Sequence, residues 1–222
     1  MHKFFAFKQK DESETELNVY GDIVSIKWFE NDVTHFDFAD ELSLVTTPNL
    51  TVRINSYGGE VSQGLGIYNL LKEWNGHVTT VCDGFACSAA SVVFVAGKTR
   101  VMPKTSLLMI HNAWTIASGD SEDFKKMAED LEKINEPIVQ SYCNATGLPV
   151  SKIQKMMNEE TWLTADEAFE LGFANKIQEE SVKASLESSV LFNLVERLKN
   201  TEKQLNPKPK PINAWEQYFG NK

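Results

Sequence analysis

Ser88 and His111 stand where a serine nucleophile and its base would be expected. Ser88 lies between a predicted strand at residues 78–82 and the start of a buried helical segment. Residues 107–110 form an apolar run that predicts a strand, and His111 follows its last residue. A serine hydroxyl becomes a good nucleophile when a neighbouring imidazole can take its proton. These residues therefore indicate acyl transfer.

Backbone N–H groups near these residues could stabilise the negative charge that develops in such a reaction. The first N–H groups of a helix have no partner within it, so the amide of Ala89 can point at a developing oxyanion. A second turn, Asn-Ser-Tyr-Gly-Gly at residues 55–59, lies between a predicted strand at residues 50–54 and a predicted helix at residues 61–74. This turn could supply another free N–H.

Each of these features also has an ordinary structural explanation. A serine at a helix start is, taken alone, more often an N-cap, and a lone histidine after an apolar run is more often a core residue. Cys87 is another possible nucleophile, but its side chain should point into the body of the protein, where small buried cysteines are common. Gly64 and Gly66 form no phosphate-binding pattern, and we expect them to allow close helix packing.

The predicted elements alternate between strands and helices. Residues 19–28 alternate apolar and polar side chains as a half-buried strand does, and further strands are predicted at residues 50–54, 78–82, 100–102 and 107–110. Helices are predicted at residues 61–74, from residue 88, and at residues 121–146. Asp120 or Ser121 would cap the last of these, and Pro137 would interrupt it.

The composition excludes several classes of function. A formal net charge of −9 makes the chain a poor ligand for nucleic acid or an anionic membrane. Three cysteines form no CxxC pair and leave an odd thiol, so neither a disulfide framework nor a zinc site is expected, and no cofactor is predicted. The first eight residues have too short an apolar stretch for a signal peptide. We therefore expect a protein of the cytoplasm of a bacterium or a phage-infected cell.

Three motifs together carry a family resemblance. Asn-Ser-Tyr-Gly-Gly at residues 55–59, Gly-Phe-Ala-Cys-Ser at residues 84–88 and Met-Ile-His at residues 109–111 occur in the order found in the ClpP family of self-compartmentalising serine peptidases. The resemblance spans about residues 17–177. Residues 160–168 and 171–174 are similar to the phage branch, the head-maturation (prohead) proteases. The family implies an α/β, ClpP/crotonase-like fold of repeated strand-strand-helix units, with a protruding helical handle at residues 121–146.

The resemblance also implies a role for individual residues. It makes Ser88 the nucleophile, His111 the general base, and Glu160, ahead of Trp-Leu-Thr at residues 162–164, the acid. The family usually has aspartate at this last position. Glutamate can equally hold the imidazole in the right tautomer and stabilise the imidazolium. Its extra methylene leaves Glu159 and Asp166 as alternative acids.

The oxyanion donors that the resemblance implies are the backbone N–H groups of Gly58 and Ala89. Many relatives have proline before the two glycines, whereas this chain has Tyr57, which puts a bulky side chain near the expected substrate groove. The implied domains are a flexible segment at residues 1–18, a peptidase domain at residues 19–178, and a C-terminal helix with a Pro/Lys-rich tail at residues 179–222.

The predicted function is that of a serine endopeptidase which assembles into stacked homo-oligomeric rings around a chamber and cleaves protein or peptide. The phage resemblance implies capsid scaffold or portal-associated protein as its substrate. One alternative is a proteolytic subunit that works with an AAA+ unfoldase, and another is a catalytically inactive assembly component. A crotonase-type acyl-CoA enzyme is disfavoured, because that group uses oxyanion holes without this Ser/His pair.

Overall fold

The computed structural model describes residues 8–9 and 12–179 of the 222-residue chain. These residues fall within a unit that ends at Glu179. The C-terminal helix and Pro/Lys-rich tail that the sequence predicts lie beyond residue 179, outside the described residues, so their prediction stays untested.

The described residues build an eight-stranded sheet in which most neighbouring strands are parallel. Its strands are β1 (Lys8–Gln9), β2 (Glu14–Val19), β3 (Asn49–Ser56), β4 (His77–Cys87), β5 (Thr99–Pro103), β6 (Leu107–Ile110), β7 (Thr161–Thr164) and β8 (Lys176–Gln178). The order is β1-β2-β3-β4-β5-β8, and β6 pairs with both β4 and β7. The β1–β2 and β6–β7 pairs are antiparallel. The predicted α/β class is confirmed.

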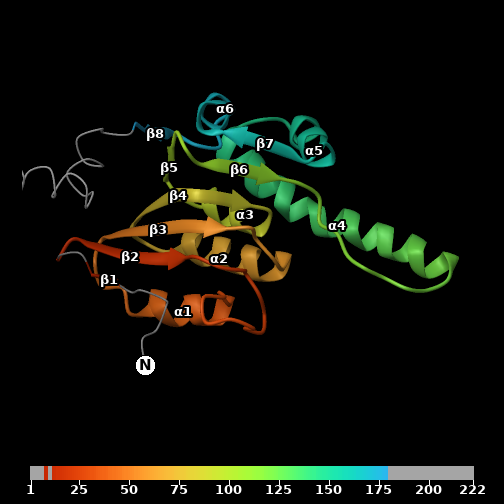
Figure 1. Cartoon of the computed structure of the whole chain (residues 1–222), viewed down its shortest axis with the longest axis horizontal. Helices are drawn as coiled ribbons and strands as arrows, with labels where there is room; N and C mark the ends of the chain where they lie inside the picture. The colour runs from red at the N-terminus through yellow and green to blue at the C-terminus, as the bar shows by residue number, and fades with distance from the viewer. Residues whose placement is uncertain (1–7, 10–11, 180–222) are drawn as a thin grey trace, which may run out of the picture. The chain divides into compact units, whose positions relative to one another are not determined.

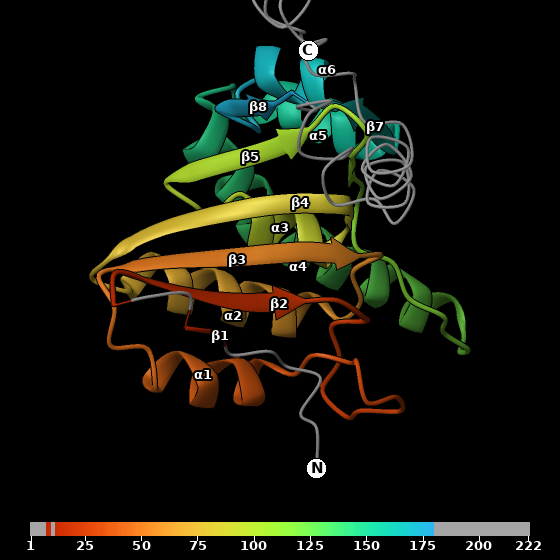
Figure 2. The ribbon, with the colours of Figure 1, turned by 60° about the vertical axis from the view of Figure 1, so that its left-hand side comes forward.

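Six helices accompany this sheet in the part of the chain that the structure describes. They are α1 (His35–Ser43), α2 (Val61–Glu73), α3 (Ala89–Phe94), α4 (Ser121–Thr146), α5 (Val150–Asn158) and α6 (Ala165–Glu170). Figure 2 shows β2, β3 and β4 side by side with α2 along one face. The long helix α4 projects away from the sheet (Figure 1), as expected for a handle.

The core lies between the sheet and the helices α2 and α3. Leu50, Val52 and Ile54 of β3 are fully buried, and every residue of α3 is buried. Gly64 lets α2 approach α3 closely, because a Cβ at this position would lie 2.9 Å from the Cβ of Ala89. The prediction of close helix packing at Gly64 is confirmed. Helix α2 therefore packs directly against the start of α3.

Strand β4 is longer than the predicted strand at residues 78–82 and pairs with two different neighbours. Its first half pairs with β5, and Phe85–Cys87 pair with Leu107–Met109 of β6. The register of β4 against β3 shifts between Ile54 and Ser56, which is the mark of a bulge. The bulge redirects the end of β4 toward β6. Both strands then end at the same edge of the sheet.

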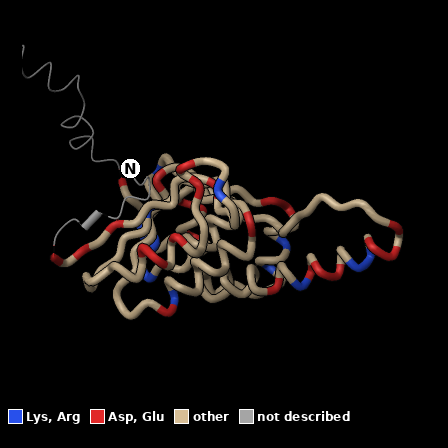
Figure 3. Tube along the Cα trace, turned by 90° about the horizontal axis from the view of Figure 1, so that it is seen from below, with Lys and Arg blue, Asp and Glu red and all other residues tan. Residues whose placement is uncertain are grey.

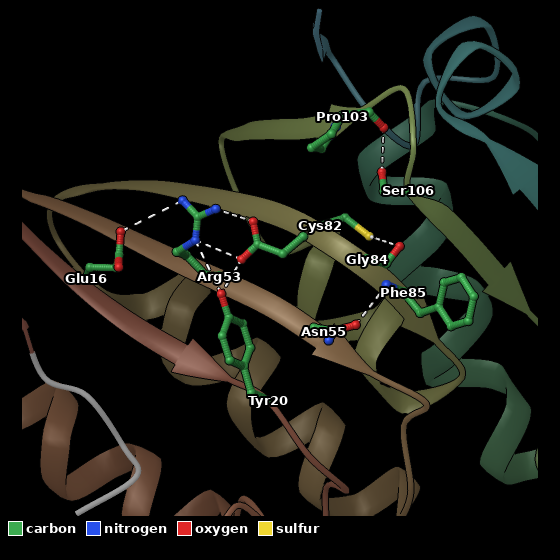
Figure 4. Close-up of polar contacts among 10 residues, drawn as sticks. Glu16, Tyr20, Arg53, Asn55, Cys82, Gly84, Phe85, Pro103 and Ser106 are labelled. Atoms are coloured by element: carbon green, nitrogen blue, oxygen red, sulfur yellow. Dashed lines mark hydrogen bonds and ion pairs between the residues drawn. The ribbon is translucent and has the colours of Figure 1, made fainter. Parts of the chain in front are cut away.

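A polar cluster ties β3 and β4 together on the sheet face turned away from α2 and α3 (Figure 4). Arg53 of β3 donates from Nε to the Asp83 carboxylate of β4 at 2.7 Å, and Tyr20 donates its hydroxyl proton to the same carboxylate. The Phe85 N–H donates to Asn55 Oδ1 at 3.1 Å. These contacts hold the bulged part of β4 in place.

The predicted strand at residues 19–28 is wrong. The strand in this region is β2, Glu14–Val19, in which half-buried and buried residues alternate. Its last residue, Val19, is the predicted first residue of the peptidase domain. After it the chain turns at Gly21 and forms only isolated bridges at Ile23. Asp32 accepts the N–H groups of Trp28 and Phe29 and closes a turn. The sequence alternates in this stretch, but Ile26 and Trp28 are exposed instead of packing on a sheet.

Helix α4 has the predicted bounds, but it runs through Pro137 without interruption. Asp120 caps its start in a capping box with Asp123, and Gly147 ends it with a left-handed φ of 73°. Pro137 removes one N–H donor, which leaves the Lys133 carbonyl without its usual partner. Both residues are exposed, so water can hydrate that carbonyl. The predicted interruption is therefore wrong.

Among the helices that the structure describes, none has both the length and the apolar character needed to cross a membrane.

Candidate active site

Ser88 lies at the end of β4 and at the N-cap position of α3. Its backbone has φ 53° and ψ −125°, a left-handed conformation that costs a residue other than glycine on the order of 1–3 kcal/mol. Its N–H donates to the Met109 carbonyl at 2.9 Å, and its own carbonyl accepts the N–H of Ser91 at 2.9 Å. Its side chain makes no cap hydrogen bond. The hydroxyl is therefore free for a neighbouring base.

His111 supplies that base in the structure. Its Nε2 lies 2.8 Å from Ser88 Oγ. The register explains this contact, because Cys87 pairs with Met109, so the residues that follow the two parallel strands emerge together. Burial lowers the pKa of His111 below its ordinary value, and the charge of Glu160 opposes this shift. The lowered pKa favours the neutral imidazole, which is the form that can accept a proton.

Glu160 lies on the other side of the imidazole. Its Oε2 is 3.9 Å from His111 Nδ1, and its side chain is 61% exposed. It precedes β7, whose Thr161 pairs with Ile110 in the antiparallel ladder, so the strand register places Glu160 beside His111. A distance of 3.9 Å is too long for a hydrogen bond. The two groups form an ion pair only when His111 is protonated, and catalytic contacts that are long in a free enzyme often tighten when substrate binds.

The alternative acids lie elsewhere. Glu159 is the C-cap of α5, and its carboxylate lies 3.8 Å from Lys155 Nζ. Asp166 lies in the first turn of α6, which begins with a capping box formed by Thr164 and Glu167. Of the three carboxylates considered from the sequence, the structure brings Glu160 to His111.

Cys87 does not compete with Ser88 in this arrangement. Its side chain is fully buried, as the sequence predicted. Burial raises the pKa of its thiol to about 11. Because the thiolate is the reactive form of cysteine, a protonated buried thiol is a poor nucleophile.

The two candidate oxyanion segments touch each other. A Cβ at Gly58, whose φ is 100°, would lie 2.9 Å from the Ala89 nitrogen and 2.5 Å from the Cys87 carbonyl oxygen. Glycine is therefore required here to let the turn approach the start of α3. The Ala89 N–H is at the first position of that helix and has no partner within it.

The structure favours a different donor from the predicted Gly58. The Gly58 N–H donates to Ser56 Oγ at 3.0 Å, so it is already occupied. The Gly59 N–H has no hydrogen-bond partner within the described residues, and Gly59 lines the same cavity. Sequence reasoning missed Gly59, because the glycine pair does not reveal which amide is free. Ser56, two residues before Gly58, was the available signal, since serine commonly bonds the amide two residues on.

Ser88 and His111 open into a cavity of about 480 Å³. Its wall includes both glycines of the turn and several apolar side chains, among them Met109 and Trp114. Tyr57 also lines this cavity, as expected from its place before the two glycines. The Tyr57 ring packs edge-on against Phe85 with centroids 5.4 Å apart. The cavity thus gives a bound molecule access to the Ser/His pair.

Known proteins match this chain in sequence and in structure. The Clp protease family model matches residues 41–181. An "ATP-dependent Clp protease proteolytic subunit" from Porphyromonas gingivalis is 33% identical over 138 residues, which cover 61% of this chain and 62% of the relative. A protein of the same name from Bacteroides fragilis (strain ATCC 25285) is 33% identical over 132 residues, which cover 58% of this chain and 63% of the relative. The matches therefore span less than two thirds of these relatives.

A solved structure has the same fold. A mutant of ClpP1 from Listeria monocytogenes superposes with a TM-score of 0.64 at 25% sequence identity, covering 75% of this chain and 92% of that one. The described sheet and helices therefore form a ClpP-like fold, and this part of the sequence prediction is confirmed.

Proposed function

The chain belongs to the Clp protease family, and from that premise we propose that it is a serine endopeptidase with Ser88 as its nucleophile. The observation that carries the proposal is the 2.8 Å contact between Ser88 Oγ and His111 Nε2. This contact joins a serine at a strained strand end to a neutral, half-buried base, as nucleophilic catalysis requires. It also favours an active peptidase over an inactive assembly component.

In the proposed reaction Ser88 Oγ attacks the carbonyl carbon of the scissile peptide while His111 Nε2 takes the hydroxyl proton. The carbonyl oxygen becomes an oxyanion, held by the N–H groups of Gly59 and Ala89. His111 then gives its proton to the leaving amine, and an acyl-enzyme remains. A water molecule, deprotonated by His111, hydrolyses the ester and restores the serine. Glu160 stabilises the imidazolium in both halves of the reaction.

We further propose that the protein works as the proteolytic subunit of an ATP-dependent system. The named relatives are ATP-dependent Clp protease proteolytic subunits, which supports an AAA+ unfoldase as partner and the cytoplasm, where ATP is available, as location. This was the alternative reading of the sequence. The phage head-maturation reading, with capsid scaffold as substrate, stays a prediction that these relatives do not support.

The proposed function predicts two separate activities. The purified protein should cleave a short unstructured peptide without ATP, because such a peptide can enter the site unaided. A stably folded protein should be degraded only when an AAA+ unfoldase and ATP are added. Peptide fluorescence and gel electrophoresis would measure the two activities. ATP-independent cleavage of a capsid scaffold protein, with no stimulation by an unfoldase, would instead support head maturation.

Ring stacking through the handle is also part of the proposal. Phe124, Met127 and Ile134 of α4 are 51%, 36% and 41% exposed. Phe124 and Met127 line an open groove of about 480 Å³ together with Leu131 and residues 115–117. Ile134 follows Leu131 on the same helix. Acidic and basic residues also alternate along the projecting helix (Figure 3). A second copy of the chain is the partner that the family relationship supports.

Leu131→Asp should therefore yield smaller species than the wild type in light scattering, because a carboxylate would have to be buried between subunits. Gln140→Asp adds the same charge to an exposed position of the same helix and should leave assembly unchanged. A monodisperse wild-type monomer that still cleaves peptides would contradict the ring architecture.

A further inference from the structure

The peptide group that joins Ser88 to Ala89 is anchored from the protein interior. Its carbonyl oxygen accepts the N–H of Ser91 at 2.9 Å, the N–H of Val92 at 3.4 Å and the hydroxyl of Ser91 at 2.6 Å. A trans peptide is planar, with its C=O and N–H pointing in opposite directions. Fixing the Ser88 carbonyl toward the interior therefore also fixes the direction of the Ala89 N–H, whose nitrogen lies next to Gly58 in the wall of the cavity.

The Ser91 hydroxyl is itself held by a residue of the handle helix. Its oxygen lies 2.7 Å from the hydroxyl oxygen of Tyr142 on α4. Because Ser91 gives its proton to the Ser88 carbonyl, Tyr142 must be the donor in this second bond. Ser91 is 0% exposed and Tyr142 1% exposed, so water does not compete for either hydroxyl. The Tyr142 ring packs against Phe173, with centroids 5.6 Å apart, which positions the phenol.

We propose that Ser91 and Tyr142 are positioning residues for the oxyanion site, acting through the Ser88 carbonyl on the Ala89 N–H. The inference rests on the proposed peptidase function and adds two residues to it. The left-handed backbone of Ser88 needs such support, because a strained conformation persists only where its surroundings fix it. Hydrogen bonds in series also polarise one another, so the anchored carbonyl makes the Ala89 N–H a stronger donor.

The series of hydrogen bonds from Tyr142 through Ser91 to Ser88 leads to a specific kinetic prediction. Tyr142→Phe and Ser91→Ala should each lower kcat by roughly 10-fold while KM changes by less than about twofold. The loss should stay below the 10²-fold to 10³-fold that follows removal of an oxyanion donor, since the Ala89 N–H remains present. The binding constant of a peptide boronate, which forms a tetrahedral adduct with the nucleophile, should weaken by the same factor as kcat.

A matched control separates positioning from stability. Thr80 is buried, and its hydroxyl donates to the Phe94 carbonyl at 2.7 Å, at the other end of α3. Thr80→Val removes a buried hydroxyl bond to the same helix but leaves the Ser88 peptide anchored. It should lower the melting temperature as Ser91→Ala does, yet leave kcat and boronate affinity near the wild-type values.

The possible outcomes decide the proposal. Wild-type kcat and boronate affinity in Tyr142→Phe and Ser91→Ala, or equal kinetic losses in Thr80→Val, would overturn it. If Ser91→Ala does not fold, the kinetics of Tyr142→Phe alone test the proposal, since this variant loses only the hydroxyl that bonds Ser91. If Ser88 of the wild-type protein does not react with a fluorophosphonate, the proposed function is refuted, and this inference is refuted with it. Normal wild-type labelling with unaffected variants would remove this inference alone.

Discussion

Replacing Ser88 with alanine should lower peptide turnover by about 10³-fold or more, because no other residue in the site could form the acyl-enzyme. The fold should survive the change. The Ser88 side chain makes no cap hydrogen bond, and alanine meets the same backbone strain as serine at a φ of 53°. The loss should therefore appear in kcat at unchanged melting temperature and oligomeric state.

Labelling provides the direct test of Ser88. A fluorophosphonate should modify this serine alone, and mass spectrometry can locate the adduct. Ser141→Ala is a suitable control, because Ser141 is buried and its hydroxyl donates to the Ile138 carbonyl at 2.7 Å. It should retain labelling and turnover. Labelling at a different serine, or undiminished labelling of Ser88→Ala, would refute the assignment.

Glu160→Gln should lower turnover by about 10²-fold to 10⁴-fold, by analogy with other triads. The amide would keep the size of the side chain but remove the charge that stabilises the imidazolium. The change should also move the pH profile. Burial already holds the pKa of His111 below its ordinary value, and the Glu160 charge raises it, so removing that charge lowers it further. The acidic limb of kcat/KM should then shift to lower pH, because His111 stays neutral in more acidic solution.

Glu159→Gln is the matched control for this experiment. Glu159 neighbours Glu160 in sequence, but its carboxylate lies toward Lys155. It should be nearly silent in both turnover and pH profile. Active-site titration would correct for any unfolded protein. Near wild-type turnover of Glu160→Gln would instead indicate a Ser-His dyad or an acid at Asp166 or Glu159.

Local signals predicted some elements residue by residue. Helix α4 begins after a capping aspartate and ends before a glycine, and both bounds agree with the structure. Strand β6 is a short apolar run that ends at a polar residue, and its bounds were also predicted. Such signals lie within the segment itself, so the sequence contains them. The wrong strand at residues 19–28 shows the limit, because the sequence alternates there although Ile26 and Trp28 are 72% and 84% exposed.

Long-range geometry was beyond sequence reasoning. The end of β4 contains Asp-Gly-Phe, a sequence typical of a turn. It continues as a bulged strand because it pairs with β3 and β6. The order of the motifs led us to expect Ser88 and His111 to pair, but only the β4–β6 register explains their contact. The preference for Gly59 over Gly58 as the proposed donor rests on one hydrogen bond, in which the Gly58 N–H donates to Ser56 Oγ. The motif contains Ser56 but does not show which amide it binds.

The place of β7 along the chain governs when the site can exist during synthesis. Strand β7 and Glu160 come more than seventy residues after Ser88, yet β7 must pair with β6 before the acid reaches His111. Contacts between such distant segments form late, because closing the intervening loop costs entropy first. A growing chain therefore exposes its serine long before its acid has emerged from the ribosome. In the proposed mechanism, the triad is therefore complete only when folding is nearly finished, and the nascent protein gains its full activity last.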